Sequence, residues 1–327
     1  MAAQQPVLSV RDLRVEFGTA AGTVQAVRGV SFDLYPGETL GVVGESGSGK
    51  SVSFLAVMGL LPTSARITGS AKMGDTELIG ADKNVMRSVR GKRMAMIFQD
   101  PLSSLNPVHK IGDQIVEMIQ AHNDVSKKQA WAQAVDLLGA VGIPQPTQRA
   151  TQYPHEFSGG MRQRVMIAMS IANDPEVIVA DEPTTALDVT VQAQILEVLD
   201  KIQRERDTAV AMITHDLGVI ARVARRVQVM YAGRIVERST IDDLFQHPTH
   251  PYTTGLLNSL PRLGQDRLSP IPGAPPNMLA PPSGCAFRPR CLHATEPCGV
   301  GIPELVPVGA SESACIRAAE LIMAAPE

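Results

Sequence analysis

The chain has 327 residues, 44% of them hydrophobic, and a formal net charge of −3. This composition is typical of a globular protein with one large core or two domains, and the balanced charge argues against a nucleic acid or an anionic membrane as partner. No apolar run reaches the roughly 18 residues that span a bilayer, and the N-terminal segment lacks the pattern of a secretory signal, so we expect a cytoplasmic protein.

The first part of the chain predicts short strands followed by a phosphate-binding loop. Residues 7–40 alternate apolar and polar positions around the turn "GTAAG". Residues 41–61, "GVVGESGSGKSVSFLAVMGLL", then place G-x-x-x-x-G-K-S between an apolar strand and a helical pattern. In that context glycines let backbone N–H groups surround phosphates, Lys50 pairs with the β- and γ-phosphates, and the Ser51 hydroxyl binds Mg²⁺. A glycine-rich turn without a ligand is the alternative.

The middle of the chain first becomes helical and then alternates strands with helices. Residues 100–173 have helical periodicity, and residues 174–245 return to strand–helix alternation that ends in a hairpin at "RRVQVMYAGRIVE". Between them, "VIVADE" predicts a buried strand with Asp181 and Glu182 at its carboxyl end, where ligands bind in open α/β sheets. Asp181 is placed to hold Mg²⁺ and Glu182 to act as general base toward water.

The end of the chain differs in composition. Thirteen of the 24 prolines fall in residues 248–307, which predicts a region without regular helix or sheet. All four cysteines, Cys285, Cys291, Cys298 and Cys315, lie in this part of the chain or just after it. Because cytoplasmic thiols stay reduced, the cluster favours metal ligation over disulfides, with four reduced core thiols as the alternative. Their spacing, C-x₅-C-x₆-C-x₁₆-C, matches neither paired zinc knuckles nor the bacterial ferredoxin run.

The order of these motifs resembles that of ABC-type ATPases. "FSGGMRQR" at residues 157–164 is similar to the family's signature motif LSGGQ, with Phe157 and Met161 as departures from it. "IFQDP" resembles the Q-loop, "ALD" the D-loop and "AMITHD" the switch segment. The resemblance covers nearly the whole chain, and it implies an α/β fold: a RecA-like core with an antiparallel β subdomain, an inserted helical subdomain and a C-terminal extension.

The resemblance also implies roles for single residues. Glu182 and His215 would be catalytic, and the signature residues Ser158, Gly159 and Gly160 would bind the ATP held by an opposite subunit. Asp188 would be the D-loop residue, and Ser51 and Gln99 would bind Mg²⁺. The nucleotide-binding residues are then Phe17, Gly44, Ser46, Gly47, Gly49, Lys50, Ser51, Ser53, Gln99 and Asp181.

The implied domains are an ATPase core at residues 1–99 and 174–246, a helical subdomain at 100–173 and an extension at 247–327. The extension opens with "HPTHPYTTGLLNSLP", which resembles ATPase subunits of oligopeptide/dipeptide-type ABC importers. Such subunits often carry a [4Fe–4S] cluster, so the resemblance implies one on the four cysteines. Arg288, Arg290 and Arg317 would offset its charge, and zinc, with His293 as a substitute ligand, is the second choice.

The resemblance finally implies partners. The chain would join a second, related ATPase subunit, two transmembrane permeases and an extracytoplasmic peptide-binding protein at the cytoplasmic face of the membrane. It would couple ATP hydrolysis to uptake of dipeptides or oligopeptides. A nickel or glutathione cargo stays open, and so does a soluble ABC ATPase that acts on ribosomes or DNA. A plain ATP-dependent kinase is disfavoured by the SGG motif, Gln99 and His215.

Overall fold

The computed structural model describes residues 4–185, 187–260 and 270–323. The chain forms two compact units, each assembled from segments that are far apart in the sequence. The first unit comprises Met1–Leu8, Leu34–Thr39 and Gly80–Ile213. The second comprises Ser9–Asp33, Leu40–Ile79 and Thr214–Glu327.

The sheet of the first unit contains three parallel strands: β6 (Met94–Ile97), β7 (Val177–Asp181) and β8 (Ala209–Thr214), with β7 in the middle. Every residue of β7 and β8 is buried, which explains their almost continuous apolar sequences. Helix α8 (Val189–Arg206) connects β7 to β8. Its buried residues recur every three or four positions at Ile195, Leu196, Leu199 and Ile202. The predicted buried strand is confirmed, and α8 agrees with the strand–helix alternation predicted for this part of the chain.

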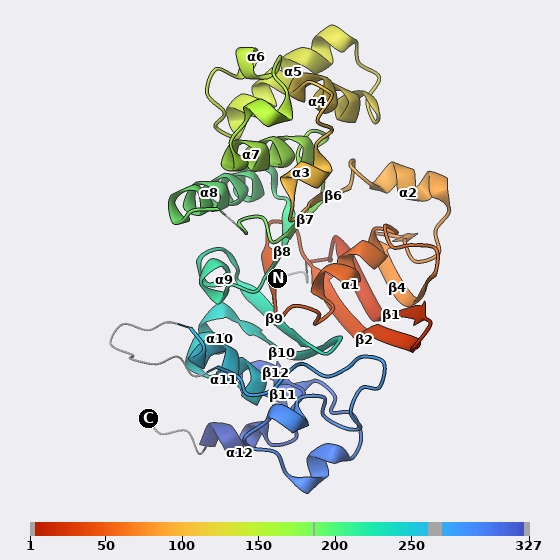
Figure 1. Ribbon diagram of the computed structural model, residues 1–327, viewed down its shortest axis with the longest axis vertical. Coiled ribbons are helices and arrows are strands. Elements are labelled where there is room, and N and C mark those ends of the chain that lie inside the picture. Colours follow the sequence, from red (N-terminus) through yellow and green to blue (C-terminus); the bar gives the residue numbers. More distant parts are fainter. Residues whose placement is uncertain (1–3, 186, 261–269, 324–327) are drawn as a thin grey trace. The chain divides into compact units, whose positions relative to one another are not determined.

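The segment between β6 and β7 is helical, as predicted. It contains α3 (Pro101–Ser104), α4 (Ile111–Gln120), α5 (Lys127–Ala140), α6 (Pro146–Arg149), the 3₁₀ helix η1 (Pro154–Glu156) and α7 (Gly159–Ser170). Helices α4, α5 and α7 pack together (Figure 1). A Cβ atom on Gly112 would lie 2.7 Å from the Trp131 ring, so only glycine permits this approach of α4 to α5.

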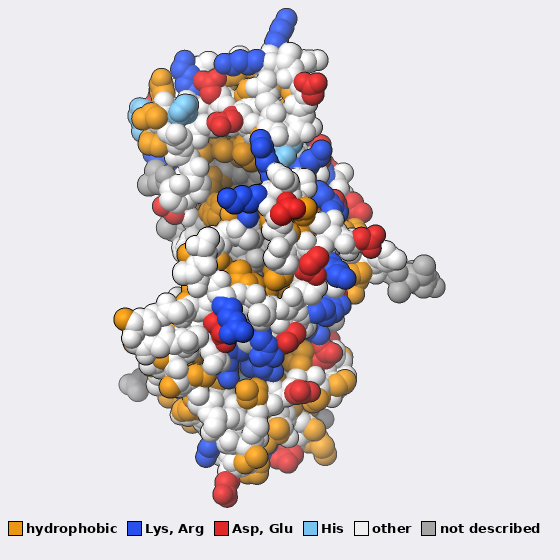
Figure 2. All heavy atoms as spheres, turned by 90° about the vertical axis from the view of Figure 1, so that its right-hand side faces the viewer, with side chains coloured by type: hydrophobic (Ala, Val, Ile, Leu, Met, Phe, Trp, Pro, Cys, Tyr) orange, Lys and Arg blue, Asp and Glu red, His pale blue; other side chains and the backbone are white. Residues whose placement is uncertain are grey.

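A further helix of the first unit, α2 (Lys83–Val89), precedes β6. On the face shown in Figure 2, Lys and Arg side chains of the helical region lie among Asp and Glu side chains. This mixture of positive and negative side chains is the one expected from the balanced composition of the chain.

None of the helices in the described part of the chain has the length and apolar character needed to cross a membrane.

The second unit contains an antiparallel sheet in the order β2-β1-β4-β5. Its strands are β1 (Leu8–Thr19), β2 (Gly22–Leu34), β4 (Ala65–Met73) and β5 (Thr76–Glu77). The alternating sequence of β1 places Leu8, Val10, Leu13 and Val15 in the core. A shift in register between Arg11 and Arg14 keeps this apolar face inward. These strands confirm the pattern predicted for residues 7–40.

The same unit contains β3 (Thr39–Val43), which runs parallel to β9 (Arg226–Tyr231). Strand β10 (Arg234–Thr240) pairs with β9 as the predicted hairpin. The hairpin does not end the sheet, because β12 (Ser311–Ser313) pairs with β10, and β11 (Val306–Val308) pairs with β12. The helices of the unit are α1 (Lys50–Val57), α9 (Leu217–Val223), α10 (Ile241–Gln246), α11 (Pro251–Asn258) and α12 (Ala318–Met323).

The prediction that residues 248–307 contain no regular helix or sheet is wrong in two places. Helix α11 begins at Pro251, and β11 begins at Val306. Proline at the first position of a helix lacks only an N–H group that has no partner there, and its φ angle already suits the helix. Much of the remaining extension does lack regular structure, apart from the 3₁₀ helices η2 (Arg288–Arg290) and η3 (Glu296–Gly299). Residues 261–269 and 324–327 of the extension lie outside the described residues.

Helix α11 is held to the sheet by Glu237 of β10, which is fully buried. The Glu237 carboxylate accepts hydrogen bonds from the backbone N–H groups of Thr249 (2.8 Å) and His250 (2.9 Å). Burial raises the pKa of Glu237 above its usual value. The start of the extension is therefore fixed to the sheet through a buried polar contact.

Candidate functional site

The glycine-rich loop of the second unit connects β3 to α1, the predicted strand–loop–helix arrangement. Lys50 is buried, and its Nζ donates hydrogen bonds to the carbonyls of Gly44 (2.7 Å) and Glu45 (3.0 Å). A Cβ atom on Gly49, whose φ angle is +98°, would lie 2.6 Å from the Ala26 carbonyl oxygen. Close packing against backbone thus requires glycine at this end of the loop.

The other predicted residues of this loop differ in exposure. Ser46 and Gly47 are exposed, and Ser51 lies half-buried in the first turn of α1. Ser53 is buried, and its hydroxyl donates a hydrogen bond of 2.8 Å to the Gly49 carbonyl. Ser53 therefore stabilises the end of the loop through its backbone, and a direct contact of Ser53 with a nucleotide stays a prediction.

Two more predicted residues belong to this unit. Phe17 lies half-buried near the end of β1, opposite Ala65 of β4. His215 is exposed and follows the last residue of β8. The next residue, Asp216, caps α9 by accepting hydrogen bonds from Gly218 and Val219. The helix cap therefore fixes the backbone that carries the imidazole.

The predicted carboxylates lie in the first unit, at the carboxyl end of β7. Asp181 is the last residue of β7, and Glu182 follows in the left-handed region with a φ angle of +47°. The Glu182 N–H donates to the Ile213 carbonyl of β8 at 2.8 Å. A non-glycine residue in this conformation is strained, and such strain is concentrated at functional sites.

Glu182 contacts the predicted Q-loop residue. Gln99 Nε2 donates a hydrogen bond of 2.9 Å to Glu182 Oε2, and the Thr185 hydroxyl donates one of 2.9 Å to the same oxygen. Gln99 follows β6 and Glu182 follows β7, which are neighbouring parallel strands. The sheet therefore brings together two side chains that are 83 positions apart in the sequence.

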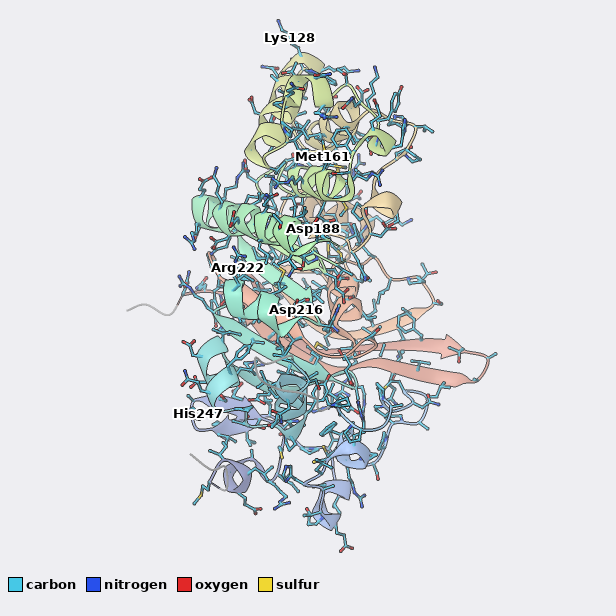
Figure 3. All side chains as sticks on the ribbon, turned by 60° about the vertical axis from the view of Figure 1, so that its left-hand side comes forward. Lys128, Met161, Asp188, Asp216, Arg222 and His247 are labelled. Carbon is cyan, nitrogen blue, oxygen red and sulfur yellow. The ribbon has the colours of Figure 1, made fainter. Side chains whose placement is uncertain are left out.

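The signature segment forms the start of α7. Ser158 caps the helix by accepting a hydrogen bond from Met161 N–H, and both Ser158 and Gly159 are exposed. A Cβ atom on Gly160 would lie 2.5 Å from Val191 Cγ1 in the first turn of α8. Asp188 caps α8 through the Val191 N–H at 2.9 Å (Figure 3 labels Met161 and Asp188). The signature and D-loop residues therefore start two packed helices.

The Phe157 departure from the signature consensus keeps the position apolar. The Phe157 side chain is buried, and the Arg149 guanidinium lies 5.8 Å from the centre of its ring. An aromatic ring in this place therefore anchors the start of α7 to the helical region. The substitution leaves the serine and the two glycines that follow it exposed or half-buried.

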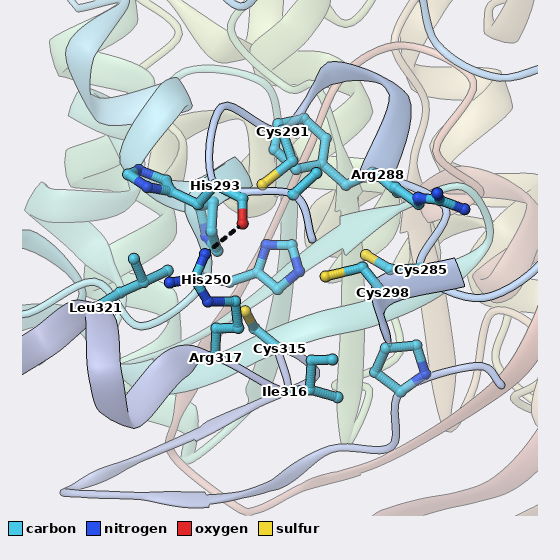
Figure 4. Close-up of a pocket in the computed structure, with 14 residues that line it drawn as sticks. His250, Cys285, Arg288, Cys291, His293, Cys298, Cys315, Ile316, Arg317 and Leu321 are labelled. Atoms are coloured by element: carbon cyan, nitrogen blue, oxygen red, sulfur yellow. Dashed lines mark hydrogen bonds between the residues drawn. The ribbon is translucent and has the colours of Figure 1, made fainter. Parts of the chain in front are cut away.

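The four cysteines line one pocket in the second unit (Figure 4). The pocket has a volume of about 370 Å³, including space open to solvent, and its wall also contains His250, Arg288, His293 and Arg317. All four thiols are free. Burial raises the pKa of Cys315 to about 11, and the neighbouring thiols act in the same direction. The predicted clustering of the cysteines is therefore present in the fold.

Two family models match this chain, one over the part that contains the glycine-rich loop and one over most of the C-terminal extension. Residues 27–185 match the family described as "ABC transporter", and residues 236–298 match "Oligopeptide/dipeptide transporter, C-terminal region". The chain is 53% identical over 298 residues to "Dipeptide transport ATP-binding protein DppD" of Bacillus subtilis. The aligned region covers 90% of this chain and 89% of the relative. The chain belongs to the family of ABC transporter ATPases.

Other relatives and solved structures agree with this assignment. "Oligopeptide transport ATP-binding protein OppD" of Haemophilus influenzae is 51% identical over 297 residues, covering 90% of this chain and 92% of the relative. The dimeric ATP-binding cassette MJ0796 bound to ADP and Pi matches with a TM-score of 0.65 and 24% identity, covering 72% of this chain and 98% of the other. The structural match supports the fold alone. The predicted ABC ATPase fold and the predicted ATP-hydrolysing activity are confirmed.

Sequence reasoning missed several contacts of this ABC ATPase. Thr185 contributes a second hydrogen bond to Glu182. Arg290, predicted to offset the charge of a cluster, instead pairs with Glu45 of the glycine-rich loop. Tyr252 also contacts Glu45, by accepting its N–H at 2.8 Å. The prediction for Arg290 is wrong because its side chain extends toward the loop; Arg288 and Arg317 do line the pocket.

The cysteine pocket offers thiols of the kind that bind an iron–sulfur cluster or a zinc ion. No group of three or more His, Cys, Asp or Glu side chains among the described residues has a spacing that could hold a metal ion. A tetrahedral zinc site with bonds of about 2.3 Å would draw the sulfurs to about 3.8 Å from one another. Four thiols around one larger pocket match the ligand set of a [4Fe–4S] cluster. The described residues therefore show neither a zinc site, also with His293, nor a bound cluster.

Proposed function

We propose that this ABC ATPase energises a peptide importer. The observation that carries the proposal is the match of residues 236–298 to the C-terminal region of oligopeptide/dipeptide transporters, beyond the cassette itself. Relatives named for dipeptide and oligopeptide transport match along about 90% of the chain. The ATPase subunit does not contact the cargo, so a nickel or glutathione cargo stays the alternative.

In this proposal each predicted residue has a role in binding or hydrolysing ATP. Lys50 and the backbone of the glycine-rich loop bind its phosphates, and Phe17 stacks on the base. Mg²⁺ is held by oxygen ligands: the Ser51 hydroxyl, the Gln99 amide oxygen and the Asp181 carboxylate. Glu182 accepts a proton from the attacking water, and His215 contacts the γ-phosphate.

The active form is a dimer of ATPase subunits in this proposal. Ser158–Gly160 of one subunit binds the γ-phosphate held by the other. Two features support this role: the Ser158 hydroxyl and the bare backbone at the exposed start of α7, a 12-residue helix whose N-terminus favours an anion. The second ATPase subunit, two permeases and a peptide-binding protein complete the complex at the cytoplasmic face of the membrane.

The complex is tested by affinity purification of the tagged chain from native membranes in mild detergent. We expect two permeases and a second ATPase subunit to co-purify, and we expect peptide uptake to fail in a strain that lacks the gene. A tagged chain with Arg222→Ala, an exposed position on α9, serves as a matched control that should retain the partners. Recovery of ribosomes without membrane subunits would contradict the proposal.

We also propose that Cys285, Cys291, Cys298 and Cys315 hold a [4Fe–4S] cluster. The support is their common pocket, the absence of disulfides between them and the two arginines that line the same pocket. When bound, such a cluster would cross-link the parts of the extension that carry the four cysteines and offer one-electron redox chemistry. The cysteine thiolates would bind it, and Arg288 and Arg317 would offset its negative charge.

The cluster proposal predicts a specific loss. In protein purified without oxygen, we expect iron and acid-labile sulfide in equal amounts, with the broad visible absorbance of an iron–sulfur cluster. Cys298→Ser should abolish both iron content and absorbance, because one of four ligands is removed. His293→Ala, which changes an exposed residue at the same pocket, should keep them. Stoichiometric zinc with no iron would contradict the proposal.

A further inference from the structure

The C-terminal extension contacts the glycine-rich loop directly at Glu45. Arg290 forms a two-point ion pair with the Glu45 carboxylate, at 2.7 Å from Nη1 to Oε2 and 3.0 Å from Nη2 to Oε1. The Tyr252 hydroxyl accepts the Glu45 backbone N–H at 2.8 Å. Two side chains of the extension therefore hold one residue of the loop through three hydrogen bonds, and both its side chain and its backbone are fixed.

Arg290 is itself rigidly positioned. Its side chain is only 5% exposed. Its Nε donates to the Pro272 carbonyl at 2.8 Å, and its Nη1 also donates to the Tyr231 hydroxyl at 3.3 Å. The guanidinium lies about 6 Å from the rings of Tyr231 and Phe287, within the range of a cation–π contact. An arginine held on all sides in this way loses little further freedom when it binds a carboxylate.

The aromatic rings around Arg290 form a compact cluster. The Tyr231 ring centre lies 4.6 Å from that of Tyr252 and 5.3 Å from that of Phe287. Tyr231 belongs to β9 of the core, whereas Tyr252 and Phe287 belong to the extension. The cluster therefore fixes the extension to the core at the point where Arg290 reaches the loop.

The charge of Glu45 matters for a loop that binds phosphates. A carboxylate in such a loop repels a triphosphate, and at short range this repulsion is strong where water is partly excluded. The ion pair with Arg290 cancels that charge. The position of Glu45 also bears on Lys50, because Lys50 Nζ donates to the Glu45 carbonyl at 3.0 Å. Arg290 thus influences both the charge and the geometry of the loop.

We propose that Arg290 is a positioning residue for nucleotide binding: by neutralising and fixing Glu45, it makes the affinity for ATP depend on the folded C-terminal extension. The inference rests on the proposed assignment of the Lys50 loop as the nucleotide site. It assigns to the extension a function in the ATPase cycle, in addition to any metal cluster it carries.

The test measures MgATP binding to the purified full-length chain by calorimetry. We expect Arg290→Gln to weaken binding about tenfold, the effect of one uncompensated charge at short range. The double variant Arg290→Gln with Glu45→Gln should regain most of this affinity, because the uncompensated carboxylate is gone. A role in stability alone would lower the melting temperature without this recovery, so absence of recovery would overturn the proposal.

The matched control is Glu312→Gln, which breaks the ion pair of Glu312 with Arg238. This pair also joins the extension to the core, between β12 and β10, but it does not contact the glycine-rich loop. We expect its affinity for MgATP to equal that of the wild type. Equal weakening in Glu312→Gln and Arg290→Gln would overturn the inference. If Lys50→Ala binds MgATP as the wild type does, the proposed nucleotide site is wrong. If Lys50→Ala loses affinity but Arg290→Gln keeps the wild-type affinity, only the proposed role of Arg290 is wrong.

Discussion

Glu182→Gln should stop ATP turnover while the chain still binds ATP. The substitution keeps the size of the side chain and an oxygen that can accept the hydrogen bonds from Gln99 and Thr185. It removes the basic carboxylate that takes up a proton from water, so we expect turnover to fall about 10²- to 10⁴-fold. The measurement is phosphate release by the complex that co-purifies with the tagged chain, together with MgATP affinity of the chain.

The matched control for this prediction is Glu205→Gln on the exposed side of α8, where Glu205 pairs with Lys201 across one helical turn. Its turnover should equal that of the wild type, since an exposed ion pair contributes little to the stability of the fold. Normal phosphate release by Glu182→Gln would remove Glu182 from the role of general base. Loss of MgATP binding in this variant would instead indicate that Glu182 helps to bind the nucleotide.

Lys50→Ala should weaken ATP binding strongly. Lys50 is buried at the start of α1, and its Nζ now holds the carbonyls of Gly44 and Glu45. Without it, the loop loses both its positive charge and the contacts that shape it, and a triphosphate would have only backbone N–H groups and the helix terminus. We expect MgATP affinity to fall at least about a hundredfold, or about 2.7 kcal/mol.

The control for Lys50→Ala is Lys72→Ala, which removes an exposed lysine on β4 of the same unit. It should bind MgATP as the wild type does. Circular dichroism and the melting temperature without nucleotide show whether Lys50→Ala still folds. A folded Lys50→Ala chain with wild-type affinity for MgATP would exclude this loop as the phosphate site.

Much of the fold could be predicted because its signals are local. The apolar run of β7 and the helical spacing in α8 depend only on residues close in the sequence, and both elements are present. The loop around Lys50 was likewise predictable, since strand, glycines and helix follow one another directly. The error at α11 also has a local cause: proline disrupts the interior of a helix, but Pro251 stands at the first position of α11, where proline is compatible with the helix.

The sequence by itself determined the ATPase family, because its motifs are short and their order along the chain is specific, and the roles of the single site residues stay predictions. It also determined that the four cysteines lie close together. Only the tertiary structure decided that Gln99 contacts Glu182 and that Arg290 contacts Glu45, pairs that are 83 and 245 positions apart. No local pattern encodes such a contact, because it arises when the pairing of strands and the burial of aromatic rings bring distant segments together.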